Sequence, residues 1–216
     1  YPVLSVVRRH PRELLLTFGL FSATSGSFYI FATFIPAYGT TTLKVSHQAL
    51  TNGLLIFAVV ELFAVMFATR STDRFGRKPL FIGCAVATTV VAYPLFLLVE
   101  TRSAVAILLV MAIGGASVGI MYGIPGSMGP ELFPPEVRYS GAGLAYQVSA
   151  AIVGGLTPVV TTAVAAAAGG TWPVALLLAL MAVTGLVSAL FCTETAKRRL
   201  RESQPRHTVE PAPTSR

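Results

Sequence analysis

The sequence predicts an all-α membrane protein, a bundle of six transmembrane helices. Of its 216 residues, 54% are hydrophobic, and the mean hydropathy is +0.70, which is too apolar for a soluble surface at this length. Crossing about 30 Å of hydrocarbon takes about 20 helical residues, and the chain contains six apolar runs near that length. None of them alternates strictly between apolar and polar residues, so helices are expected rather than a β-barrel.

The six predicted spans follow one another with short polar connections. The longer ones must tilt, kink or protrude from the bilayer. Residues 1–13 before the first span are expected to form a cytoplasmic linker, residues 14–192 the bundle, and residues 193–216 a basic, disordered cytoplasmic tail. The spans are Leu14–Tyr38, Asn52–Thr69, Pro79–Val99, Ser103–Met128, Ser140–Ala168 and Thr171–Phe191.

The distribution of cations predicts the orientation of the bundle. If the amino terminus is cytoplasmic, the cytoplasmic segments hold 14 of the 16 Lys and Arg residues, and the other side holds only Lys44 and Arg102. Cytoplasmic loops carry such an excess of Lys and Arg. We therefore expect a multi-pass protein of the cytoplasmic (inner) membrane with both termini of this chain inside the cell. The net charge of +7 then reflects orientation in the lipid bilayer and not nucleic-acid binding.

The sequence offers no catalytic or metal-binding constellation. His10, His47 and His207 all fall outside the spans, whereas an intramembrane Ser–His or His–metal site needs a histidine at depth. Cys84 and Cys192 lie in or beside apolar spans, which indicates neither a disulfide nor a metal cluster. We expect no enzyme activity, no cofactor and no metal.

The chain begins without Met, in a basic segment. A six-helix unit that opens in this way is expected to be the second half of a twelve-helix protein, with the amino-terminal six-helix half as its partner. Two other readings stay open: a stand-alone half-carrier or channel that dimerises, and a transport-inactive remnant or sensor.

A dense charge cluster separates the second and third predicted spans. The hairpin Arg70–Lys78 holds four cations in addition to Asp73. Its length makes the two spans antiparallel neighbours, and Gly76 lets the chain turn tightly. The cations can bond to the carbonyls at cytoplasmic helix ends, which carry partial negative charge, and to Glu131 or Glu136 across the bundle. Asp73 can offset the positive amino-terminal end of a neighbouring helix.

Three segments resemble motifs of the major facilitator superfamily. Asp73–Lys78 resembles the D-R-x-G-R-R/K hairpin, and Pro130–Arg138 is similar to the P-E-L-F-P-x-x-V-R segment between the tenth and eleventh helices. Tyr139–Gln147 resembles the R-Y-S-G-x-x-L-x-Y-Q/N pattern of the metabolite:H⁺ symporters, a branch that includes shikimate, α-ketoglutarate and osmolyte carriers. One position departs from the family: Thr69 stands where the first motif usually has Gly.

The resemblance implies one half of a twelve-helix fold and a gate on the cytoplasmic face. The gate contacts would form when that side is closed and break when it opens, as in a bistable switch. The simpler alternative is that the charges only set the orientation of the bundle. The gate residues would be Asp73, Arg74, Gly76, Arg77, Lys78, Glu131 and Arg138.

Glu61 is the only ionisable residue inside any predicted span. A carboxyl at this depth is costly to ionise and would often be protonated, which makes it a candidate proton carrier. The alternative is a neutral, hydrogen-bonded structural residue. Polar groups in otherwise apolar helices are candidates for lining a substrate cavity, although a lone Tyr or Gln in a bundle is more often a packing hydrogen bond: Ser27, Tyr29, Tyr122 and Gln147.

Glycines and prolines add two expectations about the helices. Gly115, Gly119 and Gly123 repeat at four-residue spacing, which is typical of close helix packing. Three prolines can each bend their helix, either as plain kinks or as moving gates: Pro36, Pro125 and Pro158. Together with the resemblance, these features predict a secondary active transporter that moves a small polar metabolite, an organic acid or a zwitterion, with protons by alternating access.

Overall fold

The structure, a computed structural model, describes residues 2–192 apart from the side chains of residues 2–5 and of Asp73. Every regular element in this range is a helix. Six helical segments are long and apolar enough to cross a membrane. The predicted all-α bundle of six spans is therefore confirmed.

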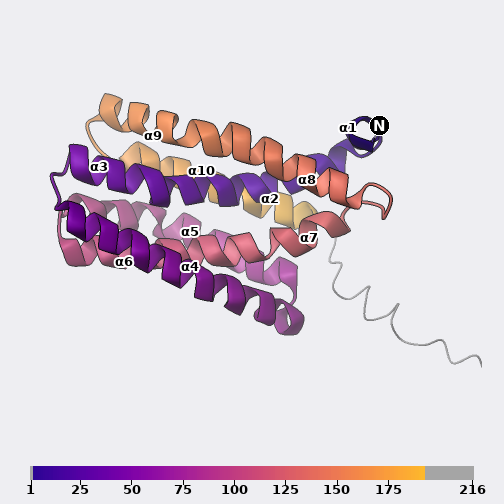
Figure 1. Cartoon of the computed structure of the whole chain (residues 1–216), viewed down its shortest axis with the longest axis horizontal. Coiled ribbons are helices and arrows are strands. Elements are labelled where there is room, and N and C mark those ends of the chain that lie inside the picture. Colours follow the sequence, from indigo (N-terminus) through magenta and orange to yellow (C-terminus); the bar gives the residue numbers. More distant parts are fainter. Residues whose placement is uncertain (1, 193–216) are drawn as a thin grey trace, which may run out of the picture.

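The spans end within a few residues of the predicted limits, and the helices run lengthwise in Figure 1. Three spans are single helices: α4 (His47–Phe75), α5 (Arg77–Glu100) and α10 (Trp172–Phe191). The other three are interrupted. The first consists of α2 (Pro11–Tyr29), the π-helix η1 (Ile30–Phe34) and α3 (Ile35–Thr41); the fourth of α6 (Ala104–Gly123) and α7 (Pro125–Glu131); the fifth of α8 (Arg138–Ser149), the π-helix η2 (Ala150–Gly154) and α9 (Gly155–Ala168).

The interruptions lie at or just before the three prolines expected to bend their helices. A proline has no N–H and its ring collides with the carbonyl four residues earlier. For Pro36 that carbonyl belongs to Ala32 inside η1, and for Pro158 it belongs to Gly154, the last residue of η2. The wider π turn makes room for the ring. Pro125 instead starts α7 directly after the break at Ile124.

Residues before the first span also form a helix. The segment expected to be a linker contains α1 (Pro2–Arg9). Figure 1 shows α1 nearly end-on, whereas the six spans run lengthwise, so α1 lies across one end of the bundle. Val6 is fully buried there and packs with Phe133 and Ala142. The predicted tail, residues 193–216, lies outside the described residues.

The closest helix packing joins α4 to α6 through the glycine repeat. A Cβ added to Gly115 would lie 2.5 Å from the carbonyl oxygen of Phe57, and one added to Gly119 would lie 2.5 Å from that of Glu61. The two contacts are four residues apart on both helices, so successive glycines of α6 pack against successive turns of the α4 backbone. The expected role of the repeat in close packing is confirmed.

Two helices lie behind the others in Figure 1. These are α5 and α10, and the front layer is formed by α4, α6 with α7, α2 with α3, and α8 with α9. Where the motif-bearing hairpin departs from the family pattern, Thr69 is exposed, and its hydroxyl donates to the carbonyl of Val65 at 2.6 Å. Among the described residues, the departure therefore does not disturb a helix contact.

Replacing Gly119 by alanine should destabilise the bundle. The added methyl cannot fit 2.5 Å from a backbone carbonyl, so α4 and α6 must separate, and overpacking of this kind costs about 1–3 kcal/mol. Gly83→Ala is the matched control, because a Cβ at Gly83 would meet no heavy atom within 4 Å. Thermal unfolding of the purified full-length protein measures both. Equal melting temperatures for the two variants would contradict this packing.

Candidate functional site

The charged hairpin is almost entirely helical. α4 continues to Phe75 and α5 starts at Arg77, which leaves Gly76 as the only residue between them. The apolar runs predicted a nine-residue connection, Arg70–Lys78, between the two helices, whereas the structure has a connection of one residue. Gly76 has φ 88° and ψ 156°, a conformation that side chains disfavour, and its N–H donates to the carbonyl of Thr72 at 3.0 Å. A single glycine therefore reverses the chain.

An ion pair connects the start of α5 to the end of α7. Arg77 Nη1 lies 2.5 Å from Glu131 Oε2, and the two side chains are only 19% and 8% exposed. Arg77 also donates to the carbonyl of Ser127 at 3.4 Å. An ion pair this sheltered is screened less by salt than a surface pair. It holds α7, which follows the break at Pro125, against α5.

Lys78 contacts a different helix from the one that Arg77 contacts. Its ammonium donates to the carbonyls of Leu190 at 2.7 Å and Cys192 at 2.9 Å, at the carboxyl end of α10. Carbonyls at the carboxyl end of a helix lack the partners that interior carbonyls have, and a cation there also complements the helix dipole. Lys78 therefore caps α10.

The opposite end of α10 is capped by the same neighbouring helix. Glu100, the last residue of α5, accepts hydrogen bonds from the backbone N–H of Thr171 at 2.8 Å and from its hydroxyl at 2.7 Å. Thr171 immediately precedes α10, so the carboxylate faces the positive end of the helix dipole. α5 thus caps both ends of α10. Glu100 was not among the predicted site residues. The sequence signals this cap only through Thr171 and a proline near the helix start, and that signal does not identify the partner of Thr171.

The remaining predicted gate residues are less connected. Arg74 is exposed, with its guanidinium carbon 5.7 Å from the ring centre of Phe75. Arg138 is the first residue of α8, and its Nε is buried without a hydrogen-bond partner among the described residues. The side chain of Asp73 lies outside the described residues. The geometry therefore gathers Arg77 with Glu131 and assigns Lys78 to α10.

Glu61 lies half-buried near the middle of α4. Its carbonyl faces Gly119, which fixes the height of Glu61 relative to α6. Tyr122 stands one turn beyond Gly119 and is 44% exposed. Glu61 and Tyr122 therefore lie within about one helical turn of each other along the α4–α6 pair.

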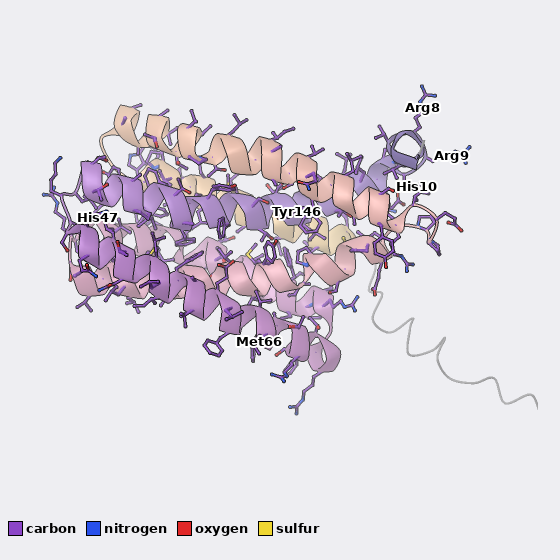
Figure 2. All side chains as sticks on the ribbon, in the orientation of Figure 1. Arg8, Arg9, His10, His47, Met66 and Tyr146 are labelled. Atoms are coloured by element: carbon purple, nitrogen blue, oxygen red, sulfur yellow. The ribbon has the colours of Figure 1, made fainter. Side chains whose placement is uncertain are left out.

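Tyr122 forms a polar pair with Tyr146, a residue that was not among the predicted candidates. Their hydroxyl oxygens are 3.2 Å apart and join α6 to α8. The ring of Tyr146 also meets Phe21 of α2 edge to face, with centres 5.2 Å apart. Figure 2 shows Tyr146 on the front layer of the bundle. The signal that could have found it is its position directly before Gln147 in the motif resembling R-Y-S-G-x-x-L-x-Y-Q/N.

The other three cavity candidates are not gathered with this pair. Ser27 is fully buried, and its hydroxyl has no partner among the described residues. Tyr29 packs against η2, where a Cβ at Gly154 would lie 2.7 Å from the Tyr29 ring. Gln147 is exposed on α8. The described residues therefore form only part of a polar site.

Helix pairing and the charged hairpin together define a class: this is a six-helix half of the major facilitator fold. The model of the family described as "Sugar (and other) transporter" matches residues 2–206. The chain belongs to that transporter family. It is accordingly a multi-pass membrane protein of a transporter family, and its relatives are not enzymes.

Curated relatives agree with this assignment. The chain is 29% identical over 205 residues to the ectoine/proline transporter ProP of Corynebacterium glutamicum, covering 95% of this chain and 40% of that protein. It is 30% identical to the glycine betaine/proline/ectoine/pipecolic acid transporter OusA of Dickeya dadantii, covering 93% and 40%. A citrate-proton symporter of Klebsiella pneumoniae is 26% identical, covering 78% and 38%. The chain thus spans about two fifths of the length of these relatives.

Removing the Lys78 cap should expose the end of α10. Burial raises the pKa of the Cys192 thiol to about 11, so almost no reactive thiolate is present at pH 8. In a Cys84→Ala background, Lys78→Met should let the last turn of α10 fray and return the thiol to water. Lys78 itself lowers the pKa of the thiol, so its loss acts in the opposite direction. We expect the return to water to dominate and to accelerate maleimide labelling of Cys192 about tenfold or more. Glu100→Gln is the control, since it weakens the far end of the same helix. Equal labelling in all three proteins would refute the cap.

Proposed function

We propose that the protein carrying this chain is a secondary active transporter that moves a small polar metabolite, an organic acid or a zwitterion, together with protons across the cytoplasmic membrane. Its relatives include transporters of ectoine, proline and glycine betaine and a citrate-proton symporter, which supports this substrate class. The observation that carries the proposal is Glu61, a carboxyl half-buried in the middle of a transmembrane helix.

Glu61 is proposed as the proton carrier. Ionising a carboxyl at bilayer depth is costly, so a closed site favours the protonated form, and entry of water from one side favours release. Because Gly119 fixes the backbone of Glu61 against α6, the carboxyl stays beside Tyr122 while water access changes. The Tyr122–Tyr146 pair would then form part of the wall of the substrate cavity, with Ser27, Tyr29 and Gln147 as further candidates. The rest of the wall would come from the amino-terminal half.

Alternating access is proposed to use the ion pair at the hairpin. α7 is separated from α6 by the break before Pro125, so it can tilt independently of α6. Such a tilt would carry Glu131 away from Arg77, which is anchored at the start of α5. The pair therefore stabilises one of two arrangements, as a bistable gate requires. Asp73 would cap a helix of the absent half, and Arg74, Gly76, Lys78 and Arg138 would support the same face.

The proposed orientation places both termini of this chain in the cytoplasm. The hairpin, the α7–α8 connection and α1 lie at one end of the bundle (Figure 1), and this end carries most of the Lys and Arg residues that the structure describes. The excess of Lys and Arg on one side supports a cytoplasmic location for that end.

Substituting Glu61 by glutamine should uncouple transport from protons. Glutamine keeps the shape and hydrogen bonds of a protonated carboxyl but cannot release a proton. We expect the full-length Glu61→Gln transporter to lose accumulation driven by a pH gradient and to keep exchange of labelled for unlabelled substrate. Uptake and counterflow in proteoliposomes measure the two activities. Accumulation that persists would make Glu61 structural.

Breaking the Arg77–Glu131 pair should impair the gate. Arg77→Gln removes one partner of a nearly buried carboxylate, a change that costs about 3–5 kcal/mol in comparable buried pairs. Initial uptake should fall at least about tenfold, because about 1.4 kcal/mol already corresponds to a tenfold change.

The charge-swapped double variant Arg77→Glu/Glu131→Arg should recover part of the uptake, which a purely orienting role of the charges does not predict. Arg70→Gln serves as the control, because Arg70 is exposed on α4 and outside this pair. Wild-type uptake by Arg77→Gln, or no recovery in the double variant, would argue against the gate.

A further inference from the structure

The end of the bundle that carries the hairpin also carries α1, which runs across it rather than along it. In Figure 1 the axis of α1 points toward the viewer, while the six spans lie in the plane of the page. A helix that crosses the end of a transmembrane bundle in this way lies along the membrane surface. Amphipathic helices bind bilayers in this orientation, with the basic residues directed to the headgroups.

One apolar contact fixes α1 to the bundle. Val6 is fully buried, and it packs into a small cluster with Phe133 and Ala142. The N–H of His10 then donates to the carbonyl of Val6 at 2.9 Å, just before α2 begins at Pro11. α1 is therefore held in place by the Val6 side chain and by its covalent connection to α2.

Three arginines project from this junction into solvent. Arg8 and Arg9 end α1, and Arg12 lies in the first turn of α2; all three are exposed. Figure 2 shows Arg8 and Arg9 pointing away from the bundle. Among the described residues none of the three has an acidic partner, because the nearby Glu13 is paired with His10 at 3.9 Å.

The surroundings of the arginines identify the level of the bilayer. Leu15, three residues after Arg12, is 68% exposed, as expected of a side chain that faces lipid. Tyr139, at the start of α8, is 86% exposed at the same end of the bundle. Tyrosine is enriched where hydrocarbon meets headgroups. These exposed side chains are consistent with a membrane interface at the end of the bundle that carries the arginines.

We propose that α1 is an interfacial helix that binds the headgroups of anionic phospholipids through Arg8, Arg9 and Arg12. The occupant is the lipid surface, because the three cations are exposed at the junction of α1 and α2 and line none of the described pockets. Each arginine near an anionic surface strengthens binding about fivefold at low salt. The site fixes the position of the chain where it enters the first span. It does not depend on the transported substrate.

Hydrogen exchange of the α1 amides in the full-length protein tests this proposal. The protein is compared in nanodiscs of phosphatidylcholine alone and of equal parts phosphatidylcholine and phosphatidylglycerol. We expect at least about tenfold slower exchange in the anionic discs, and a smaller difference at high salt. The triple variant Arg8→Gln/Arg9→Gln/Arg12→Gln should exchange equally in both discs.

Two further variants separate charge from folding. Lys44→Gln/Arg102→Gln removes exposed cations from the opposite end of the bundle and should keep the wild-type difference. Replacing the three arginines by lysines keeps the charge and should keep most of the difference. Equal exchange of the wild-type protein in the two discs would overturn the proposal, as would a lysine variant that behaves like the glutamine variant. Protection of the wild type in phosphatidylcholine discs by inorganic phosphate alone would also overturn it, because the ligand would then be a free anion.

Discussion

The close approach of α4 and α6 is the constraint on which the rest of the bundle depends. Gly115 and Gly119 let the backbones of the two helices touch at successive turns. Lipid supplies no hydrophobic force to bring helices together, so such contacts are a main source of association within a membrane. Because α4 ends at Phe75, directly before Gly76, its contact with α6 also sets where Gly76 reverses the chain.

Two parts of the proposed mechanism are positioned by that contact. Glu61 belongs to the same turn of α4 that meets Gly119, and Tyr122 follows on α6. At the end of the same pair of helices, α7 continues from α6 and brings Glu131 to Arg77. The proton site and the gate would therefore be linked through one rigid pair of helices, with the break before Pro125 as the flexible point between them.

The sequence was sufficient to predict the number and type of the spans, because a run of about 20 apolar residues is typical of a transmembrane helix. It could not predict that α4 would continue to Phe75, since charged residues at a helix end look the same as charged residues in a loop. Nor could it distinguish π turns from plain kinks at Pro36 and Pro158, because the same missing N–H produces either.

Contacts between residues far apart in the sequence were even harder to predict. The pairing of Arg77 with Glu131 was among the expected ones. Both residues belong to segments that resemble family motifs, and both segments were expected on the cytoplasmic face, so few acidic partners were available. Glu100 with Thr171, and Tyr122 with Tyr146, depend on the register of helices that pack only in three dimensions. The proposed cavity can be described only in part from this chain. The chain covers about two fifths of the length of its relatives, and the other residues of the cavity wall would lie outside it.

The double cap of α10 bears on how the bundle responds to bilayer thickness. Lys78 and Glu100 fix both ends of α10 to both ends of α5, so neither helix can slide or tilt relative to the other without losing a cap. These two helices therefore act as a pair of constant height. A thinner or thicker bilayer must be accommodated by the interrupted spans, whose π turns and proline breaks allow a change of tilt along their length.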